Sequence, residues 1–185
     1  MGLSNSWIAV RGLSQAEAIA ELGLETGDEI RHDVLPDFGI GQTSDGWTIL
    51  VFRRERAFED RFTALSKGRS AVACFEEEHV MYSEARGYAD GAETWRAVHD
   101  CEKGLRHIQT SGAVPGAFAE IEARLAKQQD EDDGADFFFD IPPELAKSVC
   151  GFRLLGEPEI TFVDLIDPNA PRKRPRLLAR LFGAR

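Results

Sequence analysis

The chain has 185 residues, of which 43% are hydrophobic and 29% are charged. This length and composition fit one globular domain with a short extension, and they argue against a chain that is disordered throughout. Asp and Glu number 32 against 22 Lys and Arg, giving a net charge of -10. Such an acidic chain is not expected to bind nucleic acid with its whole domain.

The charge is divided unevenly along the chain. Residues 171–185 carry six basic side chains and no acidic one, which leaves 16 basic against 32 acidic groups in residues 1–170. The charge of that longer part is therefore -16. The sequence predicts a single α+β domain over residues 1–168 and a basic C-terminal tail over residues 169–185.

Three cysteines, Cys74, Cys101 and Cys150, are spread through the chain without a Cys-x-x-Cys spacing. An odd, low number of cysteines argues against a disulfide framework. No apolar run is long enough for a transmembrane helix, and no signal peptide is recognised at the start. We therefore expect a cytoplasmic protein without a transmembrane segment.

The first third of the chain predicts a strand, a helix, a loop and a second strand. We expect a strand over residues 7–10 and a helix that begins at Ser14, because Ser14 and Glu17 have the spacing of a capping box and Gly23 suits a helix end. Residues 25–46 are rich in Gly, so a loop is expected there, with a short strand near residues 29–32. The apolar run 47–52 predicts a strand buried on both faces, followed by a helix over residues 57–66.

The remainder predicts an antiparallel meander and then two helices. Strands are expected over residues 71–75, 79–87, 93–100 and 105–110, with Asp90-Gly91 in a type I′ turn. Helices are expected from Pro115 to about residue 130 and over 142–149, and a last strand over 160–165. The predicted fold class is α+β: a mainly antiparallel sheet with a central meander and helices packed on one face.

The meander also holds the best candidates for acid–base chemistry. With a two-residue turn at 90–91, Tyr82 faces His99 and Glu84 faces Ala97; a three-residue turn at 102–104 then places His107 opposite His99. One sheet face would carry Tyr82, Glu84, Arg86, Trp95, His99, Cys101 and His107. Imidazole groups with carboxylate and phenol neighbours suit general acid–base catalysis, so Tyr82, Glu84, His99 and His107 are candidate catalytic residues.

A purely structural role for this group is the competing interpretation. A register shift of one residue would move His107 to the other face, and hairpin surfaces commonly carry charged cross-strand pairs. A metal site would need a further ligand that the sequence does not identify, and phosphate-loop and nucleophile-elbow motifs are missing. No metal and no cofactor are therefore expected.

The C-terminal tail mixes basic and apolar side chains. Its candidate binding residues for an anionic partner are Arg172, Lys173, Arg174, Arg176 and Arg180. Such a segment can contact an anionic membrane surface or RNA, or it can fold onto the acidic body of its own chain or of a second copy in a homodimer.

Three segments carry a resemblance to known sequences: residues 77–83 (Glu-Glu-His-Val-Met-Tyr-Ser), residues 95–100 (Trp-Arg-Ala-Val-His-Asp) and residues 140–153, which begin Asp-Ile-Pro-Pro-Glu-Leu. With them, the chain resembles a group of uncharacterised bacterial proteins over about residues 5–155. The resemblance implies a shared fold and no particular activity.

Two classes of function follow from the sequence. The first is a non-catalytic interaction protein, immunity-like or inhibitor-like, whose acidic body engages a basic protein partner. The alternative is a small enzyme that uses the Tyr82, Glu84, His99 and His107 cluster. The two are distinguished by whether these four side chains converge in one pocket.

Overall fold

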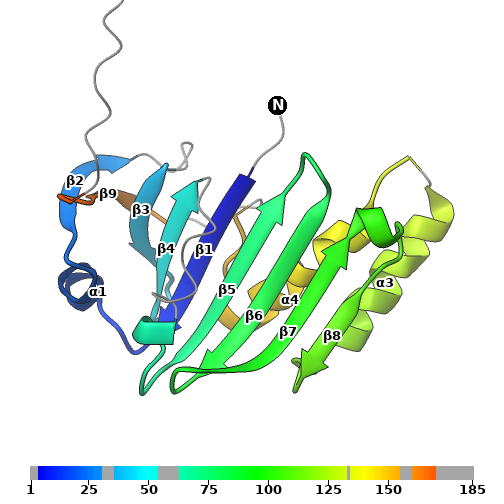
Figure 1. Ribbon diagram of the computed structural model, residues 1–185, viewed down its shortest axis with the longest axis horizontal. Helices are drawn as coiled ribbons and strands as arrows, with labels where there is room; N and C mark the ends of the chain where they lie inside the picture. The colour runs from blue at the N-terminus through cyan, green and yellow to red at the C-terminus, as the bar shows by residue number, and fades with distance from the viewer. Residues whose placement is uncertain (1–3, 31–35, 54–62, 133, 155–159, 170–185) are drawn as a thin grey trace, which may run out of the picture.

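The computed structural model describes residues 4–30, 36–53, 63–132, 134–154 and 160–169, and all structural statements concern these residues. They contain nine strands in one antiparallel sheet, in the order β2-β9-β3-β4-β1-β5-β6-β7-β8 (Figure 1). The strands are β1 (Ser4–Arg11), β2 (Glu25–Ile30), β3 (Phe38–Gln42), β4 (Trp47–Arg53), β5 (Ser70–Glu77), β6 (Tyr82–Ala89), β7 (Ala92–Asp100), β8 (Gln109–Gly112) and β9 (Phe162–Ile166). The predicted α+β class is confirmed.

Strand β1 lies at the centre of the sheet and pairs with β4 on one side and β5 on the other. Because successive side chains of a strand point to opposite faces, β1 contributes to two separate hydrophobic clusters. Trp7 and Ala9 belong to one cluster, and Ile8 and Val10 belong to the other. The strand is buried on both faces, which explains the unbroken apolar run over residues 7–10.

The helices are distributed over the two clusters. Helices α3 (Phe118–Glu131) and α4 (Ile141–Cys150) pack on the face of Trp7, together with the 3-10 turn η2 (Phe137–Asp140). In Figure 1 they lie behind the meander, while no described helix covers the near side of β6–β8. The shorter helix α1 (Gln15–Leu22) belongs to the cluster on the face of Ile8. The two main helices thus share one face, as expected, and α1 packs on the other.

The local signals for helix α1 are confirmed in detail. The Ser14 hydroxyl accepts a hydrogen bond from the Glu17 amide at 3.2 Å, and the Glu17 carboxylate accepts from the Ser14 amide at 2.8 Å. This reciprocal pair satisfies two amides that have no partner within the helix. Gly23 ends the helix with φ of 64°.

The structure corrects the predicted loop over residues 25–46. Strands β2 and β3 form there, and β9 lies between them in the sheet. Glycines in β3 allow this close approach, because a Cβ at Gly41 would lie 2.5 Å from a side-chain carbon of Ile160. Residues 31–35, which include part of the predicted strand at 29–32, lie outside the described residues, as does most of the predicted helix over 57–66.

The predicted register between β6 and β7 is wrong by one residue. Asp90 and Gly91 do adopt positive φ values of 51° and 79°, as a type I′ turn requires. The register then shifts at Gly87, which pairs with Trp95, so that Thr94 is an extra residue on β7. A Cβ at Gly87 would lie 1.9 Å from the Trp95 indole nitrogen, so this position needs glycine.

One further boundary differs from the prediction. The last meander strand is β8, which begins at Gln109; residues 101–103 instead form the 3-10 turn η1 (Cys101–Lys103), and residues 104–108 connect η1 to β8. The predicted helices near 115–130 and 142–149 and the predicted strand at 160–165 correspond to α3, α4 and β9.

Candidate functional site

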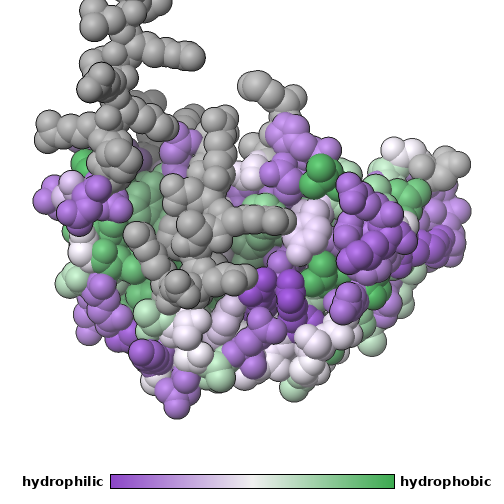
Figure 2. Space-filling view, in the orientation of Figure 1, coloured by the Kyte–Doolittle hydropathy of each residue, from purple (hydrophilic) through white to green (hydrophobic). Residues whose placement is uncertain are grey.

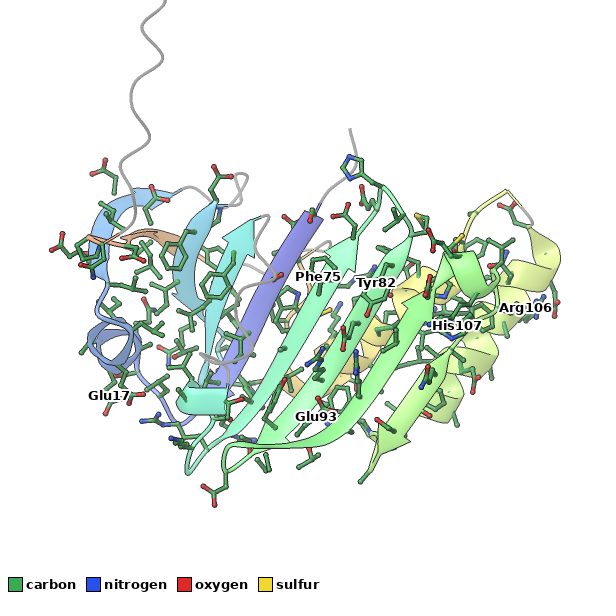
Figure 3. All side chains as sticks on the ribbon, in the orientation of Figure 1. Glu17, Phe75, Tyr82, Glu93, Arg106 and His107 are labelled. Carbon is green, nitrogen blue, oxygen red and sulfur yellow. The ribbon has the colours of Figure 1, made fainter. Side chains whose placement is uncertain are left out.

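Tyr82 lies on the face of β6 that no described helix covers (Figure 3). Glu84, two residues further along β6, lies on the same face. The Tyr82 hydroxyl donates a hydrogen bond to Glu84 Oε2 at 2.9 Å. The other Glu84 oxygen forms ion pairs with Arg86 on the same strand and Arg96 on β7. Arg86 also lies 3.8 Å from the Glu93 carboxylate. These side chains form an open-face charge network in which each charged group has an opposite charge beside it.

This network determines the protonation of its members. Burial alone would raise the pKa of Glu84, but the hydrogen bond and positive charge of Arg86 outweigh it and lower that pKa. Burial and the neighbouring Glu84 carboxylate raise the pKa of Tyr82. Glu84 is therefore an ionised carboxylate held by two guanidinium groups, and Tyr82 is a neutral phenol. Neither group is poised to exchange a proton near neutral pH.

His99 lies on the opposite, helix-covered face and is fully buried. Its Nδ1 is 2.8 Å from the His107 carbonyl oxygen, and its Nε2 is 3.0 Å from Asp136 Oδ2 in the segment before η2. A carbonyl oxygen can only accept a hydrogen bond, so Nδ1 carries a proton. Both ring nitrogens are used within the protein, which makes His99 a clamp between the sheet and the helical layer.

His107 lies in the connection before β8, with its ring centroid 6.4 Å from that of His99. Its Nδ1 accepts a hydrogen bond from the Asp100 amide at 3.1 Å, which requires an unprotonated Nδ1. Burial lowers the pKa of His107, and the positive charge of Lys103 acts in the same direction. His107 is thus a neutral imidazole that holds the loop against the end of β7.

The four candidate catalytic residues therefore form two pairs on opposite faces rather than one cluster. The register shift at Gly87 causes this separation, because it brings Val98 opposite Glu84 and Asp100 opposite Tyr82. In the described part of the chain, no group of three or more His, Cys, Asp or Glu side chains is arranged to hold a metal ion. The tail residues Arg172, Lys173, Arg174, Arg176 and Arg180 lie outside the described residues.

The three cysteines are free thiols. Cys74 and Cys150 are buried; burial raises the pKa of Cys74, and it raises the pKa of Cys150 to about 12. Burial and the carboxylates of Asp136 and Asp100 raise the pKa of Cys101. Because the thiolate is the reactive form, none of these cysteines is activated as a nucleophile.

A second surface feature lies at one end of the meander, at the upper right of Figure 1. The turn between β5 and β6 contacts η1 there, since the Cys101 amide donates to the Met81 carbonyl at 3.2 Å. An ion pair between Arg106 and Asp130 joins the next connection to the end of α3. We call this end the acidic rim. Its acidic members are Glu77, Glu78, Asp100, Glu102, Asp130, Glu131 and Asp132.

Exposed apolar side chains interrupt the acidic rim. Val80 is 51% exposed in the β5–β6 turn and Leu105 is 45% exposed in the loop after η1. Figure 2 shows small hydrophobic patches surrounded by hydrophilic surface over this end of the sheet. The basic residues Lys103 and Arg106 are each paired with a rim carboxylate. The rim therefore has more carboxylates than basic residues, and it carries two exposed apolar side chains.

The structure makes two residues prominent: Asp136, which sequence reasoning missed, and Glu76, which sequence reasoning assigns to an acidic surface. Asp136 is the partner of His99, although 37 positions separate them in the chain. Glu76 is only 2% exposed, and neither of its carboxylate oxygens has a hydrogen-bond partner in the described structure. The run Glu76-Glu77-Glu78 resembles a solvated charge run, and only the alternation of buried residues along β5 could have indicated that Glu76 points inward.

Comparison of the chain with protein-family models, with curated proteins and with solved structures finds no match. Among the described helices, none has the length and apolar character needed to span a membrane.

Proposed function

We propose that this protein is a non-catalytic interaction protein whose acidic body engages a basic protein partner, in the manner of an immunity protein or inhibitor. The observation that carries the proposal is the acidic rim, which combines exposed carboxylates with the exposed apolar side chains of Val80 and Leu105. Complementary charge accelerates association, and apolar contact slows dissociation. A basic partner with exposed apolar side chains fits both properties.

The arrangement of the catalytic candidates favours this function over the enzyme alternative. An enzyme using Tyr82, Glu84, His99 and His107 would need them around one reacting group, whereas the sheet separates them. Both nitrogens of His99 are engaged in hydrogen bonds within the protein, so neither is free to exchange a proton with a substrate.

The test is affinity capture from the native host with the full chain, a chain ending at residue 170, and two charge-reversal variants. The rim variant is Glu102→Lys with Glu131→Lys. The matched control is Glu25→Lys with Asp45→Lys, which makes the same charge change at exposed sites outside the rim. We expect one stoichiometric, basic protein to bind the wild-type, shortened and control chains, and to bind the rim variant at least about tenfold more weakly.

Three outcomes would contradict the proposal: no stoichiometric partner, an acidic partner, or equal binding to the rim and control variants. Turnover in a broad substrate screen, lost on substitution of Glu84 or His107, would favour the enzyme alternative instead.

A further inference from the structure

The buried face of β5 holds a carboxyl group without a partner. Glu76 lies two residues beyond Cys74 on the helix-covered face, and its cross-strand neighbours Asn5 and Ser83 are also buried. The Ser83 hydroxyl donates a hydrogen bond to the Phe139 carbonyl oxygen at 2.7 Å, so it does not donate to Glu76. Both Glu76 oxygens remain buried without a hydrogen bond among the described residues. Burying a hydrogen-bond acceptor without a partner lowers the stability of the fold, and burying it as an ionised carboxylate lowers the stability further.

A second buried polar atom, on a side chain near Glu76, also has no hydrogen-bond partner among the described residues. Arg153, just after α4, is close enough for its charge to act on Glu76, and its buried Nε has no hydrogen-bond partner in the described structure. The two terminal nitrogens of Arg153 are used elsewhere. One forms an ion pair with Asp140, and the other lies 3.6 Å from Glu144. Arg153 thereby holds the first turn of α4, which begins after Asp140.

We propose that Glu76 and Arg153 form a proton-controlled clasp on the N-terminal end of α4. With Glu76 protonated, Arg153 stays with Asp140 and Glu144, and the first turn of α4 is held. When Glu76 releases its proton to solvent, its carboxylate attracts the guanidinium of Arg153. Asp140 and Glu144 lose their shared cation, and the start of α4 loosens.

The charged groups around Glu76 set the pH range in which the clasp changes state. Burial raises the pKa of Glu76 to about 7; the positive charge of Arg153 opposes this, and the negative charges of Asp140 and Glu78 reinforce it. On the neighbouring strands, Asn5 and Ser83 carry no charge, and Cys74 on β5 is a neutral thiol because burial raises its pKa. The clasp therefore changes state near neutral pH, independently of any partner at the acidic rim.

Hydrogen exchange of the full-length protein between pH 6 and pH 8 tests the clasp, after correction for the pH dependence of intrinsic exchange. We expect amides of residues 141–146 in the wild type to lose about tenfold in protection at pH 8, because ionisation of Glu76 is linked to opening. Glu76→Gln should keep its protection at both pH values. Glu93→Gln, which alters an exposed glutamate, should behave as the wild type.

Arg153→Gln tests whether Arg153 links the ionisation of Glu76 to the opening of the first turn of α4. This variant should show low protection of residues 141–146 at both pH values, since Asp140 lacks its ion pair throughout and Glu144 keeps only Arg124. Unchanged protection of the wild type across the range would overturn the proposal, and so would a tenfold step that persists in Glu76→Gln or in Arg153→Gln. The wild-type profile decides the matter even where a variant does not fold.

Discussion

Two buried glutamates on opposite faces of the meander have opposite environments: one has several partners and the other has none among the described residues. On the open face, Glu84 is paired with Arg86 and Arg96 and bonded by the Tyr82 hydroxyl. On the helix-covered face, the Glu76 carboxyl has no hydrogen bond to any described residue, although Glu76 lies on the adjacent strand. The difference indicates that the hydrogen-bonding and charged partners within reach of a carboxyl group, rather than its residue type, set its pKa in this sheet.

The covered face also contains a carboxylate that is satisfied. His99 and Asp136 form a buried pair in which both imidazole nitrogens have partners. The same face thus holds a paired acid, Asp136, and an unpaired acid, Glu76. Removing the imidazole partner of Asp136 should therefore lower the free energy of unfolding, whereas replacing Glu76 by a neutral residue should raise it.

The largest effect is expected from His99→Ala. This change leaves Asp136 buried without its partner and frees the His107 carbonyl, so the free energy of unfolding should fall by about 3–5 kcal/mol. Urea denaturation measures it. The matched control is His79→Ala, because His79 is exposed in the β5–β6 turn, and its loss should stay within about 0.5 kcal/mol. Equal losses for the two variants would contradict the clamp role of His99.

Glu76→Gln should give the next largest effect, and it should stabilise the protein. The pKa of Glu76 is raised in the folded state to about 7 from an unfolded value of 4.5. The stability contributed by its proton is therefore fully present below pH 4.5 and is lost as the pH rises through 7. Between pH 5 and pH 8 the wild type should lose about 2–3 kcal/mol relative to Glu76→Gln.

Denaturation of both proteins across this pH range measures the difference. Glu93→Gln is the control and should follow the wild-type pH profile. A stability difference between Glu76→Gln and the wild type that does not change with pH would show that Glu76 is already ionised at pH 5.

Much of the fold could be predicted because its signals are local. The capping box of Ser14 and Glu17, the apolar run of β4 and the Asp90-Gly91 turn each depend on neighbouring residues. Strand β3 and most of β2 were missed because their glycine-containing sequences pair with β9, more than 100 residues later. Pairing between distant segments leaves no periodic pattern in either one.

The candidate site was harder to predict than the fold. The extra residue at Thr94 places His99 on the face opposite Glu84, because a register shift of one residue moves each side chain of the strand to the other face. The bulge follows from the packing of Trp95 on Gly87, a contact that no turn rule specifies. The burial of Glu76 likewise depends on α4 and Arg153, which come more than 60 residues later.

The contrast between the two faces is tested most directly by the titration of Glu76 and Glu84 in one sample. Carbon-13 NMR of glutamate side-chain carboxyls, assigned with Glu76→Gln and Glu84→Gln, follows both groups. We predict a midpoint near pH 7 for Glu76 and a midpoint below 4.5 for Glu84. Coincident midpoints, or a Glu76 midpoint at or below 4.5, would contradict the account.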